Sequence, residues 1–246
     1  MASATPPGEA RRAELVRGLG AVRRRIADAC AAAGRDPRSI TLVAVTKTRP
    51  AADVVTLAAL GVLDVGESRD QEAVPKVAEV RGLLASGAPQ PRWHFVGQLQ
   101  SRKTRSVVGY AHAVHSLDRP ALVERLADGV RQAGRPPLEV FIQVSLDGDP
   151  DRGGVEVAGL LPLAGEVAAR PELLLRGVMA VAPLGADPDA AFAGLAAASA
   201  RLRAEFPHAD AISAGMSADL DQAIRHGSTH VRVGSALLGR REQVFG

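Results

Sequence analysis

Short apolar runs alternate with helix-like segments from residue 41 to the end of the chain, and this alternation constrains the fold more than any other feature. Each run is long enough for a buried strand, and each is followed by a segment with helical spacing or helix-forming residues. Strands that alternate with helices form a parallel sheet. The strand-like runs are 41–46, 62–66, 92–97, 113–117, 138–145, 175–181, 209–214 and 230–234. The helix-like segments are 51–60, 69–86, 100–108, 119–133, 156–169, 188–205, 218–226 and 236–242.

Eight such strands predict an α/β protein built as a single closed (β/α)8 TIM barrel over residues 1–246. We expect residues 1–8 to form a flexible N-terminus. Residues 8–34 predict an extra N-terminal helix, because apolar side chains recur there at helical spacing: Leu15, Leu19, Val22, Ile26 and Cys30. The alternative is an open doubly wound sheet, and the lack of a G-x-G-x-x-G pattern after the first strand weakens it.

The composition narrows the classes of partner. The net charge is +3, and no long basic run or nucleic-acid-binding motif occurs, so we expect no nucleic-acid partner. No apolar stretch reaches the ~18 residues of a membrane span, and the N-terminus does not resemble a signal peptide. A single cysteine is typical of a reducing compartment, so we expect a cytoplasmic protein. No residue spacing predicts a metal site.

Lysine is rare here, and one lysine ends the first strand. Only three of the 30 basic residues are lysines: Lys47, Lys76 and Lys103. Strand parity places Lys47 on the same face as Val43 and Val45, which leads to the mouth of the predicted barrel. A primary amine can form an imine, whereas a guanidinium cannot. The parity leaves two interpretations open: Lys47 is a functional amine, or it is an ordinary solvent-exposed lysine at the end of the strand.

Two late turns favour the functional reading. Gly215, Ser217 and Asp219 follow the seventh strand, and Gly234 and Ser235 follow the eighth. Each turn leads into a predicted helix, so free backbone N–H groups and the helix dipoles predict an anion site there. Loops after strands seven and eight often hold phosphate in this fold. Together with the mouth lysine, they indicate a ligand with a phosphate and a carbonyl.

Seven motifs in this order resemble the pyridoxal phosphate homeostasis protein family, whose members are similar to the barrel domain of alanine racemase, a fold-type III pyridoxal-phosphate protein. The motifs occupy 45–50, 66–68, 93–100, 115–119, 176–179, 215–219 and 227–234. The resemblance implies that Lys47 forms the internal aldimine with pyridoxal 5′-phosphate. It implies a phosphate site at Met216, Ser217 and Gly234, beside Ser235. By similarity to alanine racemase, it also implies that Arg232 faces the pyridine nitrogen.

The resemblance implies a function of holding pyridoxal 5′-phosphate and supplying it to apo-enzymes, without robust amino-acid catalysis. The alternative is a pyridoxal-phosphate-dependent amino-acid racemase. Racemisation needs an acid/base group on each face of the substrate. Alanine racemase takes its second group, a tyrosine, from a second β domain, which we expect this chain to lack. The only tyrosine here, Tyr110, is not at the end of a predicted strand. Without that domain we expect a monomer.

Several residues near the predicted strand ends keep open roles. Ser68, Arg102 and Ser145 stand where the family pattern has Asn, which places the local hydrogen bonds around the cofactor in doubt. Glu67 follows the second strand and is interpreted either as a partner of Lys47 or the cofactor, or as a helix-capping carboxylate. His94 is interpreted as a hydrogen-bonded core histidine in preference to a cofactor contact.

Overall fold

The molecule is a closed barrel of eight parallel strands in the order β1 to β8, with β8 paired back onto β1. This computed structural model describes residues 8–149 and 152–239. It confirms the predicted barrel and excludes the open sheet. The strands are β1 (Thr41–Val45), β2 (Asp64–Glu67), β3 (Arg92–Phe95), β4 (Ala111–Leu117), β5 (Leu138–Gln143), β6 (Leu173–Met179), β7 (Ala211–Ser213) and β8 (His230–Val233).

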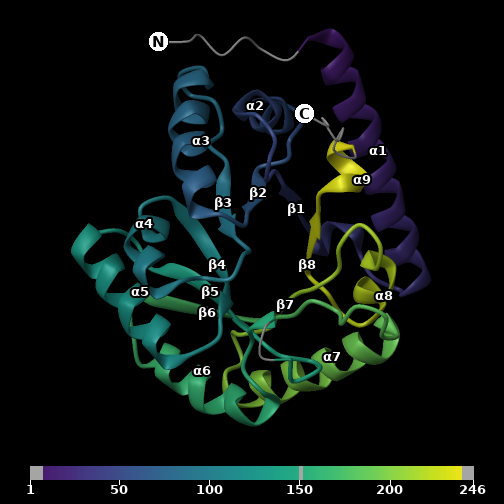
Figure 1. Cartoon of the computed structure of the whole chain (residues 1–246). Coiled ribbons are helices and arrows are strands. Elements are labelled where there is room, and N and C mark those ends of the chain that lie inside the picture. Colours follow the sequence, from purple (N-terminus) through teal and green to yellow (C-terminus); the bar gives the residue numbers. More distant parts are fainter. Residues whose placement is uncertain (1–7, 150–151, 240–246) are drawn as a thin grey trace.

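Helices follow the strands and form the outer layer of the barrel (Figure 1). The α-helices are α1 (Glu9–Ala32), α2 (Ala51–Ala59), α3 (Asp70–Leu83), α4 (Thr104–Val108), α5 (Pro120–Ala133), α6 (Leu160–Ala168), α7 (Pro188–Glu205), α8 (Leu220–Arg225) and α9 (Ser235–Leu238). Short 3-10 helices are η1 (Pro37–Ser39), η2 (Ser101–Lys103) and η4 (Val157–Gly159). Residues 1–7 of the predicted flexible N-terminus and residues 240–242 of the predicted last helix lie outside the described residues.

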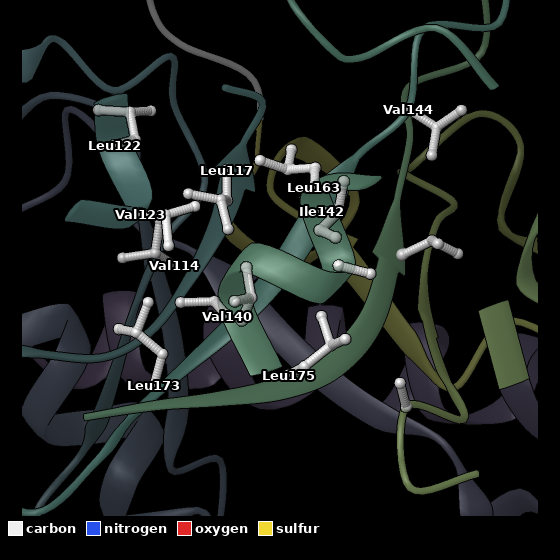
Figure 2. Close-up of a cluster of buried hydrophobic side chains, with 14 of the residues drawn as sticks. Val114, Leu117, Leu122, Val123, Val140, Ile142, Val144, Leu163, Leu173 and Leu175 are labelled. Atoms are coloured by element: carbon white, nitrogen blue, oxygen red, sulfur yellow. The ribbon is translucent and has the colours of Figure 1, made fainter. Parts of the chain in front are cut away.

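The larger hydrophobic core lies between the strands β4 to β6 and the helices that cover them. Figure 2 shows Val114, Val140 and Ile142 from neighbouring strands packed with Leu122 and Leu163 from α5 and α6. These side chains are fully or almost fully buried. Each buried aliphatic side chain of this size contributes about 1.5–3 kcal/mol of burial free energy. This part of the barrel therefore forms a rigid support for the opposite side, where the strands β8 and β1 meet.

The first helix covers the seam between β8 and β1, beside α8 and α9 (Figure 1). Its five predicted apolar positions, Leu15 to Cys30, are all buried, as the sequence spacing indicated. Gly18 allows a close approach, because a Cβ there would lie 2.2 Å from the backbone oxygen of Leu237. Helix α1 is thus part of the barrel wall and holds the C-terminal elements against β1.

None of the helices in residues 8–149 and 152–239 is both long enough and apolar enough to cross a membrane.

Candidate functional site

Lys47 lies two residues beyond the end of β1, at the carboxyl-terminal mouth of the barrel. Val43 is paired with Arg232 of β8 and Val45 with Gly66 of β2, and register neighbours share a face of the sheet. Ala44 instead belongs to the core beneath the helices. The predicted parity of β1 is confirmed, so the strand carries its inner face directly to the exposed Lys47.

The side chain of Lys47 lines a pocket of about 380 Å³ that also contains Gly234 and Ser235. Such a volume lies within the range of about 300–1,000 Å³ typical of ligand sites. The adjacency of β1 and β8 in the closed barrel explains why residues separated by almost the whole sequence meet here. Arg49, Ser68 and further side chains complete the wall: Val45, Thr48, Arg69, Glu72, Leu238 and Gly239.

Three backbone N–H groups at this mouth are free to bind an anion. Those of Ser217, Gly234 and Ser235 donate to no group in the part of the chain that the structure describes. The Ser217 hydroxyl accepts from the N–H of Ala236 at 3.3 Å, which ties the turn after β7 to the start of α9. The turns after β7 and β8 thus present their donors from one joined surface.

Met216 differs from its neighbours. Its N–H donates to the Asp219 carboxylate at 2.6 Å, so this donor is already occupied. The helices after these turns are also shorter than the sequence predicted, since α8 spans 220–225 and α9 spans 235–238. Short helices have weak dipoles, so the free N–H groups, not the helix dipoles, are the main feature of these turns that favours an anion.

Gly234 has space that the protein itself does not fill. Its φ is −112°, and a Cβ there would meet only Val45, at ordinary contact distances of 3.4 and 3.6 Å. Gly215 is constrained in a different way, because its φ is +88° and a Cβ would lie 2.6 Å from the Cβ of Ala223. Folding therefore requires the glycine at 215, whereas the glycine at 234 leaves room for a ligand such as a phosphate group.

Arg232 is buried inside the barrel, with only 5% of its surface exposed. Its guanidinium donates to the Ser213 hydroxyl at 2.6 Å and to the Ala180 carbonyl at 2.9 Å. Burial lowers the pKa of Arg232 to about 10, partly offset by the charge of Asp219. The guanidinium remains cationic at neutral pH and has further N–H donors for a ligand atom.

A chain of hydrogen bonds crosses the barrel interior from Arg232 to Asp64. Ser213 lies 2.7 Å from Nδ1 of His115, whose Nε2 lies 2.8 Å from Nδ1 of His94. Nε2 of His94 lies 2.9 Å from the Asp64 carboxylate. With both imidazoles neutral, every donor points from the cation toward the carboxylate, so all groups in this chain are satisfied.

The electrostatics of that chain agree with a neutral imidazole at His115. Burial, followed by the nearby charges of His94 and Arg232, holds the pKa of His115 well below its ordinary value. Burial alone raises the pKa of Asp64, but hydrogen bonds from His94 and Arg92 outweigh it and lower that pKa well below the usual range. His94 is therefore a satisfied interior histidine, as the sequence interpretation favoured, and it supports Arg232 indirectly.

A second buried network holds the chain on both sides of Lys47. The Lys76 amine donates to the Thr46 carbonyl at 2.8 Å and to the carboxylates of Glu67 and Glu72 at 2.7 and 2.9 Å. The Thr46 hydroxyl also donates to Glu67, at 2.7 Å. Three acceptors around one nitrogen suit an ammonium and not a planar guanidinium, which explains the lysine at 76.

Glu67 is fully buried between β2 and α3, and burial raises its pKa in spite of the hydrogen bonds from Lys76 and Thr46. Its hydrogen-bond partners are these two residues, so Glu67 does not cap α3, and it acts on Lys47 only through the neighbouring Thr46. Thr48, on the other side of Lys47, has a φ of +63° and donates its N–H to Glu72. A β-branched residue in this region is strained, and such strain concentrates at functional sites.

The remaining residues singled out in the sequence lie around the mouth. Ser68 lines the Lys47 pocket. Arg102 and Lys103 line a neighbouring cavity, and Lys103 lies 3.3 Å from Asp70. Ser145 accepts the N–H of Gly148 in the loop after β5 and does not line the Lys47 pocket.

Comparisons with known proteins agree with this geometry. Residues 18–242 match the family model described as alanine racemase, N-terminal domain. The chain is 45% identical over 245 residues to the pyridoxal phosphate homeostasis protein of Mycobacterium tuberculosis, and the match covers 94% of each chain. The chain belongs to the pyridoxal phosphate homeostasis protein family.

Solved structures extend the family relationship to the fold. PipY of Synechococcus elongatus, with pyridoxal phosphate bound, has a TM-score of 0.75 and 34% identity, covering 87% of this chain and all of PipY. Alanine racemase of Corynebacterium glutamicum has a TM-score of 0.63 at 19% identity, covering 93% of this chain and 62% of the racemase. At that identity the racemase shows the shared barrel fold alone.

Proposed function

We propose that this chain binds pyridoxal 5′-phosphate at the mouth of its barrel and takes part in pyridoxal phosphate homeostasis in the cytoplasm. One observation carries the proposal: the Lys47 amine shares a pocket with the free N–H groups of Gly234 and Ser235. An amine that bonds an aldehyde carbon and donors that bind a phosphate are the two functions that this cofactor requires.

Each site residue then has a defined part. Lys47 would bond the aldehyde carbon as an imine, and the N–H groups of Ser217, Gly234 and Ser235 would bind the phosphate. Arg232 would donate to the ring nitrogen and keep it unprotonated, because a permanent cation disfavours a second positive charge. The cofactor supplies an electron sink when bound, and an unprotonated ring makes that sink weaker. Met216 would contribute only after Asp219 releases its N–H.

We propose that the protein handles the cofactor and does not racemise amino acids. The only tyrosine, Tyr110, immediately precedes β4, so it lies at the amino-terminal end of the strands, away from Lys47. Its hydroxyl is buried, and burial raises its pKa, both of which oppose a role as a base. The sequence-based predictions of a monomer and of apo-enzyme acceptors are part of this proposal.

The covalent assignment is tested by borohydride reduction of the protein loaded with pyridoxal 5′-phosphate. We expect visible imine absorbance and, after reduction, a pyridoxyl label on Lys47. Because the chain has only three lysines, peptide mapping distinguishes Lys47 from Lys76 and Lys103 without ambiguity. Lys47→Ala should lose absorbance and label, whereas Lys103→Arg should keep both. A label that persists in Lys47→Ala would refute the assignment.

The cofactor-handling role is tested by mixing the loaded protein with an apo-enzyme and following the enzyme's activity. We expect activation faster than the rate of spontaneous release into buffer. Activation at the spontaneous rate would contradict delivery, and sustained racemase turnover by the loaded protein alone would contradict the non-catalytic assignment.

A further inference from the structure

A second cavity lies next to the Lys47 pocket at the mouth of the barrel. It has a volume of about 190 Å³ and shares Ser68 and Arg69 with the Lys47 pocket. The shared residues make the two cavities neighbours along one wall, between the ends of β2 and β3. The rest of its lining is mostly polar: Asp70, Gln71, Phe95, Gln98, Gln100, Arg102 and Lys103.

The charge of this cavity is unbalanced. Arg69, Arg102 and Lys103 are cationic, and Asp70 is its only acidic lining residue, so the formal charge is +2 (three minus one). Lys103 lies 3.3 Å from Asp70, which neutralises that pair. Among the described residues, no carboxylate forms an ion pair with Arg102 on η2, and Arg69, on the wall shared with the Lys47 pocket, has only the longer-range charge of Glu72.

Neither guanidinium is satisfied by the protein. Within residues 8–149 and 152–239, the side chain of Arg69 makes no hydrogen bond or ion pair. Arg102 makes one hydrogen bond, from Nε to the Gln100 side chain at 3.2 Å, which leaves its outer N–H groups free. Guanidinium forks are the side chains that best match carboxylates.

The two cavities together fit a molecule with an amine at one end and two carboxylates. We propose that this second cavity binds an acidic amino acid of the glutamate class, whose amine meets the cofactor carbon held by Lys47. Arg69, on the wall that the two cavities share, would bind the carboxylate next to the amine, and Arg102, an exposed residue that lines only the second cavity, would bind the side-chain carboxylate. The amide groups of Gln98 and Gln100 offer further hydrogen bonds.

This proposal rests on the proposed function and supplies a means of unloading the cofactor. The amine of the amino acid attacks the cofactor carbon and forms a new C–N bond, while the bond from that carbon to Nζ of Lys47 breaks. Two protons would move from the incoming nitrogen to Nζ, so one imine and one neutral amine are exchanged for another such pair, atoms and charges balance, and no oxidant or reductant is needed. The cofactor then leaves with the amino acid, and Lys47 is again a free amine.

The test measures binding of L-glutamate to the cofactor-free protein by calorimetry, with L-glutamine as the neutral isostere. We expect glutamate to bind at least about tenfold more tightly, since one well-placed ion pair contributes roughly this factor. Arg69→Gln or Arg102→Gln should remove that preference. The matched control is Arg105→Gln, which removes the same charge from an exposed position of α4 outside the cavity. This variant should keep the preference for glutamate. Equal affinity for both amino acids, or an equal loss in Arg105→Gln, would overturn the proposal.

A second measurement separates this inference from the proposed function. Adding L-glutamate to the loaded protein should shift the visible absorbance and lower borohydride labelling of Lys47, and glutarate, which lacks an amine, should do neither. Arg102→Gln, which lines only the second cavity, should label normally without glutamate but resist unloading by it. Absent labelling in the unmodified chain refutes the proposed function, whereas normal labelling that glutamate does not lower refutes only the second site.

Discussion

Two positions at the barrel mouth carry glycine for different reasons, and alanine substitutions distinguish these reasons. Gly234→Ala should leave the free energy of unfolding within about 0.5 kcal/mol, because its φ is negative and its Cβ space is open. Its affinity for pyridoxal 5′-phosphate should fall about tenfold, the cost of displacing one charge-assisted hydrogen bond. Gly215→Ala should instead destabilise the fold by more than about 1 kcal/mol, because of its positive φ and the contact with Ala223. Denaturation and cofactor titration of both variants check this, and a Gly234→Ala variant with unchanged affinity would contradict the phosphate site.

Two buried serines in the barrel wall provide a similar contrast. Ser213→Ala removes the group that joins Arg232 to His115, so two buried polar groups lose a partner. We expect a loss of about 1–3 kcal/mol in the free energy of unfolding, measured with urea. Ser116 is the matched control, because its buried hydroxyl has no partner among the described residues. Ser116→Ala should change stability little, and equal effects of the two substitutions would show that the hydrogen-bond chain contributes nothing.

At the scale of the element, α1 holds the turn that carries one of the proposed phosphate donors, Ser217. Arg25 donates to the Asp221 carboxylate at 2.6 Å and to the backbone oxygen of Ser217. Arg25→Gln should therefore loosen this turn and weaken cofactor affinity several-fold, mainly by faster release. Arg24→Gln removes the same charge from an exposed position of α1 and should leave affinity unchanged. Cofactor release rates measured after dilution compare the variants, and identical rates in both would mean that α1 does not position the turn.

The sequence predicted the elements better than their ends. Alternation located all eight strands, yet the strand expected at 113–117 begins at Ala111, because pairing with Trp93 of β3 extends it. The helix expected over 100–108 starts as a 3-10 turn before α4. Such limits depend on how neighbouring strands are paired, and local propensity carries no information about that pairing.

In the candidate site, too, the sequence predicted local features but not the contacts between distant residues. Rarity and parity made Lys47 a candidate while leaving two interpretations open, and nothing local could reveal that Lys76 fixes Thr46 on one side of it. The histidine chain was missed for the same reason, because His94 and His115 meet only when β3 and β4 are in register. The cavity beside Arg69 depends on loops from two strand ends and has no signal in the sequence.

For the whole molecule, buried histidines make stability depend on pH. Burial is the main reason that the pKa of His230 falls to about 3 and that the pKa of His115 lies well below its ordinary value. Unfolded histidine titrates near ~6.5, so below that pH the unfolded chain binds more protons than the folded one. A depressed folded pKa means that the stabilisation is complete above about pH 6.5 and is lost as pH falls toward the folded value. The depressed pKa of Asp64 has the same sign, but it acts at lower pH, below the unfolded aspartate value of ~3.9.

The free energy of unfolding, measured with urea at intervals from pH 7 to 4.5, should therefore fall with pH, and this window excludes most of the Asp64 contribution. His230→Gln removes one of these titrating groups but keeps a polar side chain of similar size, so the stability of the variant should fall less steeply over the same window. His208→Gln, at an exposed position of the loop before β7, is the matched control and should keep the slope of the unmodified chain. If the His230→Gln slope equals that of the control, a charged His230 is accommodated within the folded barrel, and the acid sensitivity comes from the other histidines with lowered pKa values, His112 and His115.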